Sequence, residues 1–198
     1  MKKTIIDNFS QILLIVFSVV LGLYLSERIE DYKNEKEAEQ LMSKIKSELN
    51  ENKKLLDAWA PYHVEIVNSL DSIINNKEFV SKFISNKKNL YQVFTRGTIM
   101  SETPKNDAWD IAKSHPLIVN IDYDELLALS RVYKQQEYTF EPIPSLVNLL
   151  ISPDFNKKEY AQSNLQLFKE QLSDIADRET QLINYYNEAN RLLKFQSN

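Results

Sequence analysis

An apolar segment near the N-terminus constrains the fold more than any other feature. Residues 9–25 read FSQILLIVFSVVLGLYL and carry no charge. Together with Ile5 and Ile6, the stretch reaches the lower limit of roughly 17 to 20 residues for a helix that crosses a bilayer. It ends in Leu-Tyr-Leu rather than in the small residues of a signal-peptidase site, and tyrosine suits a membrane–water interface. The segment predicts a retained anchor over residues 9–26, with a cleaved signal peptide and a buried core helix as alternatives.

The charges that flank this segment bear on its orientation. Lys2 and Lys3 precede it, and Arg28, Lys33 and Lys36 follow it among acidic residues. Counting only Lys and Arg, the two flanks nearly balance, so the positive-inside rule gives a weak preference. We expect a cytoplasmic tail over residues 1–8 and a helical domain over 27–198 in the periplasm, held at a bacterial inner membrane.

Small residues recur on one face of the predicted anchor. Ser18, Gly22 and Ser26 are spaced by four residues. In lipid such a stripe lets two helix backbones approach closely, and packing drives their association. The spacing predicts self-association or docking of a partner helix, although small residues are also common in spanning helices that pack against nothing.

The chain beyond the anchor is predicted to be helical. The whole sequence contains two glycines, which argues against an all-β fold with many tight turns. No glycine or proline occurs from Glu27 to Ala60, and apolar residues there recur every three or four positions. We therefore expect one continuous rod from the membrane to about residue 60, where Pro61 ends it or begins the next helix.

A second long helix is predicted at the C-terminal end, from about residue 157 to 195. Its apolar positions alternate by three and four residues, with Glu179 as the single polar member. The predicted fold is all-α: the two long helices pack antiparallel and short helices cap the membrane-distal end. An intermolecular coiled coil is the alternative arrangement.

Turn and cap residues divide the region between the long helices. Asn75 and Asn76 are typical of a turn, and Gly97 of a helix C-cap. The other predicted elements are short helices at 77–84 and 87–96, a helix that starts at Thr103-Pro104 and ends near Ser114, a helix from an Asp122/Glu125 capping box to about Tyr138, a loop at Pro142 and Pro144, and a second cap-then-proline start at Ser152-Pro153.

Residues that carry chemistry are scarce. The chain has no cysteine, no glycine-rich loop and only two histidines, His63 and His115, neither of which lies in a metal-binding spacing. No G-x-S-x-G motif is present. A net charge of −4 gives no nucleic-acid footprint. We therefore expect no enzyme activity, no cofactor, no metal and no nucleic-acid partner.

Two groups of residues remain as candidate sites. Trp109, Tyr133 and Tyr123, with Asp122, could form a pocket for a ligand or a partner, although aromatic residues at helical spacing more often fill a core. The carboxylates of Asp122, Asp124 and Glu125 indicate either a site for a cation or basic partner, or ordinary acidic residues at a helix N-terminus.

The order of these features resembles a broad group of single-span bacterial membrane proteins of unknown function, many from Bacteroidota. The residues that carry the resemblance are Leu21-Gly22-Leu23 in the anchor, Glu48-Leu49 with Asn52 in the first long helix, Ala108-Trp109, Ile121-Asp122-Tyr123 with Leu126, and Leu129-Ser130 with Tyr133. The resemblance covers residues 9–137 and implies membrane placement without an activity.

Two hypotheses follow. The first is an anchored, non-enzymatic interaction module that forms homo-oligomers or serves as an accessory subunit of a larger membrane assembly. The second is an anchored sensor with a ligand pocket near Trp109, Tyr123 and Tyr133.

Overall fold

The computed structural model describes residues 2–76, 80, 89, 92–155 and 157–195. Within these ranges the chain forms helices, turns and irregular segments, with no β-strand. The elements follow one another as α1 (Lys2–Ile74), α4 (Asp107–Ser114), the 3₁₀ helix η1 (Pro116–Asn120), α5 (Tyr123–Phe140), α6 (Ile143–Ile151), the 3₁₀ helix η2 (Lys158–Tyr160) and α7 (Ala161–Phe195). The all-α prediction is confirmed.

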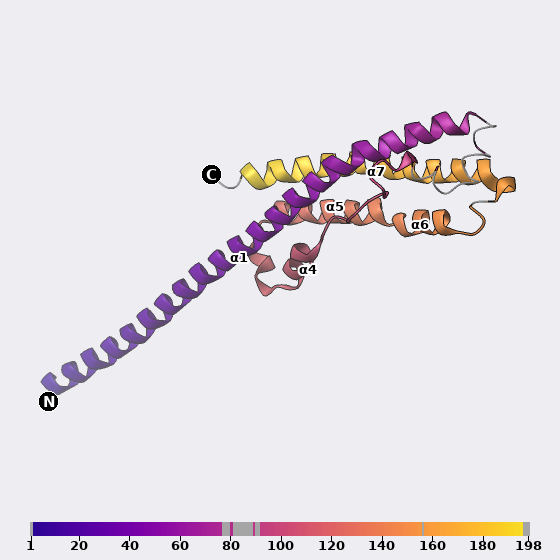
Figure 1. Ribbon diagram of the computed structural model, residues 1–198. Helices are drawn as coiled ribbons and strands as arrows, with labels where there is room; N and C mark the ends of the chain where they lie inside the picture. Colours follow the sequence, from indigo (N-terminus) through magenta and orange to yellow (C-terminus); the bar gives the residue numbers. More distant parts are fainter. Residues whose placement is uncertain (1, 77–79, 81–88, 90–91, 156, 196–198) are drawn as a thin grey trace.

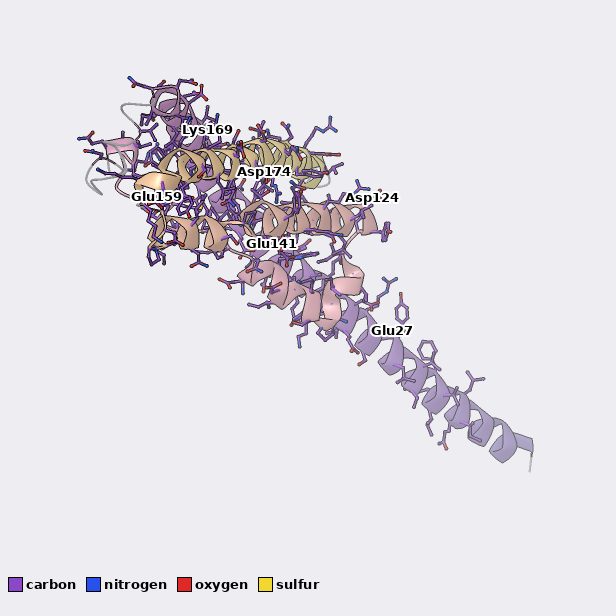
Figure 2. The ribbon with its side chains drawn as sticks, turned by 90° about the vertical axis from the view of Figure 1, so that its right-hand side faces the viewer. Glu27, Asp124, Glu141, Glu159, Lys169 and Asp174 are labelled. Atoms are coloured by element: carbon purple, nitrogen blue, oxygen red, sulfur yellow. The ribbon has the colours of Figure 1, made fainter. Side chains whose placement is uncertain are left out.

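Helix α1 dominates the molecule and extends far beyond the other helices (Figure 1). It contains one segment that is long and apolar enough to cross a membrane, and none of that segment is buried. From residue 11 to residue 37 every α1 side chain except Asn34 is exposed, and the first buried side chain is Ala38. Figure 2 shows Glu27 on this unaccompanied part of α1.

The predicted end of α1 near residue 60 is wrong, because the helix continues through Pro61 to Ile74. Proline has no N–H to donate to the preceding turn, so neighbouring structure must hold the helix together there. Residues 96–99 lie along this part of α1 and form four hydrogen bonds with it, one of them from the Arg96 N–H to the Tyr62 hydroxyl at 3.3 Å. Arg96 Nη1 donates to the Ala58 carbonyl at 2.9 Å, the Tyr62 hydroxyl donates to the Thr98 carbonyl at 2.9 Å, and His63 Nε2 lies 2.9 Å from the Ile99 oxygen.

The two long helices pack against each other within the chain and run in opposite directions (Figure 1). Helix α5 packs along α7 and completes the core. The buried apolar residues form two clusters. One surrounds Ile66, Leu70, Phe168 and Leu172 towards the end of α1. The other surrounds Ile45, Leu49, Leu129 and Tyr186 and lies nearer the apolar segment.

The predicted cap of short helices at the membrane-distal end is found only in part. Helix α6 does contact the first half of α7, which packs on the distal part of α1. Helix α4 and η1 instead contact α1 and lie on the side of the body that faces its N-terminal half (Figure 1). The short helices therefore cover two ends of the body.

Local signals gave mixed results in the region between the long helices. The predicted turn at Asn75-Asn76 is confirmed, and Gly97 has the positive φ of 75° that favours glycine. The predicted helices at 77–84 and 87–96 lie mostly outside the described residues. The helix predicted from Thr103-Pro104 begins only at Asp107, although its end at Ser114 is confirmed.

The remaining corrections concern the second half of the chain. The loop predicted at Pro142 and Pro144 is wrong, because both prolines lie at the start of α6, where a missing N–H is tolerated. Ser152 is the C-cap of α6 rather than the start of the last helix. That helix, α7, begins at Ala161, after the short η2 turn.

Candidate functional site

Two of the four residues predicted to form a pocket lie side by side. The rings of Trp109 on α4 and Tyr133 on α5 stack face to face, with centroids 5.3 Å apart and an interplanar angle of 3°. Both side chains are buried. No space for a ligand remains between rings at this separation. A groove of about 580 Å³ does lie beside them and is lined by Lys113, Lys134 and Phe140 among others.

The other two predicted residues lie elsewhere. Asp122 is the N-cap of α5: its Oδ1 accepts from the N–H groups of Asp124 at 2.9 Å and Glu125 at 3.2 Å. Tyr123 is 74% exposed and lies apart from the stacked pair. The structure thus brings Trp109 and Tyr133 together and places Asp122 and Tyr123 outside their contact.

A buried carboxylate on α1 anchors the stacked pair. The start of α4 has no cap of its own, since Asn106 makes no side-chain capping bond. Glu48 supplies that cap: its Oε2 accepts from the Ala108 N–H at 2.8 Å and its Oε1 from the Trp109 N–H at 3.4 Å. A carboxylate at a helix N-terminus is also favoured by the helix dipole. The Tyr133 hydroxyl donates to Glu48 Oε1 at 2.7 Å.

Asn52, one turn after Glu48, fixes the chain that leads into α4. Its Oδ1 accepts from the Lys105 N–H at 2.8 Å and its Nδ2 donates to the Lys105 carbonyl at 2.6 Å. Gln136 on α5 donates to the same carbonyl at 3.0 Å and accepts a bond from the Tyr186 hydroxyl of α7. These contacts explain why no helix begins at Pro104: the backbone of Lys105 is engaged by α1 and α5.

The two tyrosines of this polar cluster serve as hydrogen-bond donors. Burial raises the pKa of Tyr133 strongly, and its bond to Glu48 raises that pKa further. Burial also raises the pKa of Tyr186. Both hydroxyls therefore keep their protons at neutral pH. The arrangement suits a rigid junction between α1, α4, α5 and α7 rather than proton transfer.

Trp109 and Tyr133 were predicted as pocket residues, whereas Glu48, Asn52 and Ala108 were named only through the resemblance described above. The structure joins all five in this cluster. The contributions of Gln136 and Tyr186 were missed. One signal was available for Glu48 and Asn52: they lie among Ile45, Leu49 and Leu56, on the face of α1 that is buried.

A second buried polar contact links α1 to α7. His63 and Glu179 are both fully buried, and His63 Nδ1 lies 2.9 Å and 2.8 Å from the two carboxylate oxygens. The other ring nitrogen faces the Ile99 carbonyl, which can only accept, so Nε2 carries a proton. The contact therefore holds one proton between Nδ1 and the carboxylate. Glu179, the polar member of the predicted seam, thus has its partner on α1.

A long groove runs between α1 and the start of α5. Its volume is about 1070 Å³. One wall is α1 from Asp31 to Lys46, and the other is formed by residues 120–122 and Glu125. Five carboxylates line it together with a single lysine: Asp31, Glu35, Glu39, Asp122, Glu125 and Lys46. Asp124 lies outside this groove, at the exposed start of α5 (Figure 2).

Among the described residues, no three histidine or acidic side chains converge closely enough to hold a metal ion. Neither candidate surface therefore offers a ready metal centre in that part of the chain.

No protein-family model, curated protein or solved structure matches this chain.

Proposed function

We propose that this chain is a single-span protein of a bacterial inner membrane that acts by binding other membrane proteins rather than by catalysis. In this proposal its N-terminus is cytoplasmic and its helical body periplasmic, which is the weak preference of the flanking lysines and arginines. It works as an oligomerising scaffold or as an accessory subunit of a larger complex. The observation that carries the proposal is the continuity of α1, one helix from the apolar segment into the core.

The exposed part of α1 supports an interaction role. A helix that is apolar over this length is stable in lipid, where its backbone bonds are satisfied within the helix. The Ser18 hydroxyl donates to the Leu14 carbonyl at 2.8 Å, so its polar group is satisfied there too. A Cβ at Gly22 would meet nothing within 4 Å. The fold of the single chain does not require glycine at this position, and close helix–helix contact would.

The buried polar groups also support an interaction role rather than a catalytic one. Glu48, His63 and Glu179 are each held in contacts between helices. Each of these groups has a structural task that accounts for its burial.

The test is purification of the tagged full-length protein from its native host in a mild detergent, with mass photometry and identification of the chains that accompany it. We expect a homo-oligomer or a stoichiometric partner, and Gly22→Leu should release it while the helical content stays unchanged. Gly22→Ala, which keeps a small residue, is the matched control and should retain the assembly. A monomer without a partner would contradict the proposal.

The groove beside Trp109 and Tyr133 favours a second function, an anchored sensor that binds a small molecule. In that case Trp109→Ala should abolish binding of one metabolite and leave the assembly intact. Gly22→Leu should have the opposite effect. Native mass spectrometry of the two variants separates the functions.

A further inference from the structure

The groove along α1 carries a net negative charge. Its five carboxylates face one lysine. The ammonium of that lysine, Lys46, also donates to the Leu193 carbonyl at 3.0 Å. Among the described residues, no ion pair involves Asp31, Glu35 or Glu39, although Glu37 on another face of α1 pairs with Lys33 at 3.8 Å.

One of these acidic residues, Glu125, has a largely buried side chain. Glu125 lines the groove and is only 9% exposed. Within the described ranges its carboxylate makes no hydrogen bond and no ion pair. Burial raises the pKa of this group, and the more distant Lys46 lowers it only in part. Because Glu125 lines the groove, a cation that enters the groove would lie close to its carboxylate.

The spacing of the exposed acidic residues indicates which shape of cationic partner would match them. Asp31, Glu35 and Glu39 are each four residues apart, which puts them in a row on one face of α1. Like charges at this spacing destabilise a helix slightly unless opposite charges face them. From Asp31 to Lys46 the wall is about 22 Å long. A row of this length suits an extended basic element and far exceeds a single ion.

The groove has the size of a helix laid against α1. A helix about 10 Å across and 22 Å long occupies roughly 1700 Å³, which is of the same order as the groove volume of about 1070 Å³. The groove begins five residues beyond Ser26, the last residue of the predicted anchor. Along a helix this distance is about 8 Å, which places the groove beside the membrane surface.

We propose that this groove binds a helix rich in lysine and arginine that belongs to a second membrane-anchored protein and runs beside α1 just outside the bilayer. The inference rests on the proposed function and names the chemistry of the partner. Basic residues that follow a partner's own span would meet Asp31, Glu35 and Glu39 in turn. One of them would reach Glu125 and neutralise it.

The test uses the full-length protein in nanodiscs of phosphatidylcholine, a lipid without net charge that does not attract the probe. The probe is a fluorescent peptide of about 20 residues with lysine at every fourth position on an alanine background. A peptide of the same charge interrupted by prolines is the first control. Spermine, a flexible small cation, is the second. Fluorescence anisotropy measures each affinity.

Two triple variants separate the groove from overall charge. Glu35→Gln, Glu39→Gln and Glu125→Gln remove three charges from the groove, and Glu27→Gln, Glu30→Gln and Glu37→Gln remove three from the rest of the same helix segment. We expect the groove variant to weaken binding of the helical peptide by about tenfold or more, and the control variant by about twofold. Thermal unfolding of both variants confirms that the fold is retained.

Several other results would overturn the groove assignment. Equal losses in the two variants would mean that net charge alone attracts the peptide. Equal affinity for the proline-interrupted peptide or for spermine would exclude a helical occupant, and no binding would exclude a basic one. If a native partner accompanies the groove variant as well as the wild type, the proposed function stands and the groove assignment falls. If the peptide binds specifically but no partner or oligomer is found, the proposed function fails alone.

Discussion

Glu125 shows how a single residue can oppose the stability of the fold that contains it. Its pKa is raised above the ordinary carboxyl value of 4.5, so the folded chain holds this proton to a higher pH than the unfolded chain does. Between the two pKa values the folded state binds more protons, and the stability therefore falls as the pH rises through that window. The carboxylate is most unfavourable when it is fully ionised.

Glu125→Gln is therefore expected to stabilise the protein at pH 7, by about 1 kcal/mol. The gain should shrink as the pH falls and vanish below about pH 4, where the wild-type carboxyl is protonated in both states. Thermal unfolding of both proteins, followed by circular dichroism at pH 7 and pH 4, measures this. A variant less stable than the wild type at pH 7 would show that the carboxylate has a stabilising partner.

Glu179 presents the opposite case, a buried charge whose partner is in place. Glu179→Leu leaves His63 Nδ1 buried without a partner and should destabilise the fold by about 3 to 5 kcal/mol. Glu179→Gln should cost much less, because its amide N–H can donate to Nδ1 while Nε2 keeps its bond to Ile99. Thermal unfolding compares the two variants, and equal losses would mean that the hydrogen bond to Nδ1 contributes nothing.

At the scale of the element, α4 depends on another helix for its N-terminal cap. Eight residues are too few for an isolated helix to be stable in water, so contacts from α1 hold it. Glu48 makes two of them and also accepts from Tyr133. The position of α4 is thus tied to one carboxylate on the helix that enters the membrane in our proposal.

Glu48→Ala should destabilise the protein by about 1 to 3 kcal/mol and release α4 in particular. Hydrogen exchange should become faster at Ala108 and Trp109, while the middle of α7 stays protected. Unchanged exchange in α4 would show that packing of Trp109 alone holds this helix.

Hydrophobic periodicity predicted the two long helices, because in each of them the apolar residues recur on one face over thirty or more residues. The seam of α7 and the polar position of Glu179 were both visible in the sequence. The identity of its partner was not, since His63 lies 116 residues away and periodicity relates only neighbours in one helix. Local signals failed at Thr103-Pro104 and at Pro61 for a related reason. Contacts from Asn52 and from residues 96–99 outweigh local preference at those points.

The candidate sites divide along the same line. Trp109 and Tyr133 could be selected from the sequence as aromatic residues of interest, and their stacking makes them part of one cluster. Asp122 and Glu125 were visible as a capping pair, and the capping by Asp122 is present. The groove itself could not be predicted, because its walls come from segments about 80 residues apart that meet only through the tertiary fold.

At the scale of the whole molecule, the continuity of α1 fixes the directions in which its two ends face. Each helical residue turns by about 100°, so Asp31 and Glu35 lie about 180° and 220° around the axis from Gly22. Glu39 continues the row to about 260°, so the acidic row faces mostly away from the small-residue stripe. A helix packed on the stripe within the bilayer would leave the groove open to a different chain outside it.

This geometry makes the binding of partners by α1 depend on its helical phase as well as on its sequence. Two alanines inserted after Arg28 would turn the groove by about 200° relative to the span, whereas four would turn it by about 40° and lengthen the rod by about 6 Å. If the chain on the stripe and the chain in the groove contact each other in one assembly, we expect the two-residue insertion to abolish their joint co-purification and the four-residue insertion to retain it. Co-purification that survives both insertions would mean that the partner contacts only one end of the helix. The chain can therefore join two neighbours only while α1 keeps the helical phase that relates the stripe to the groove.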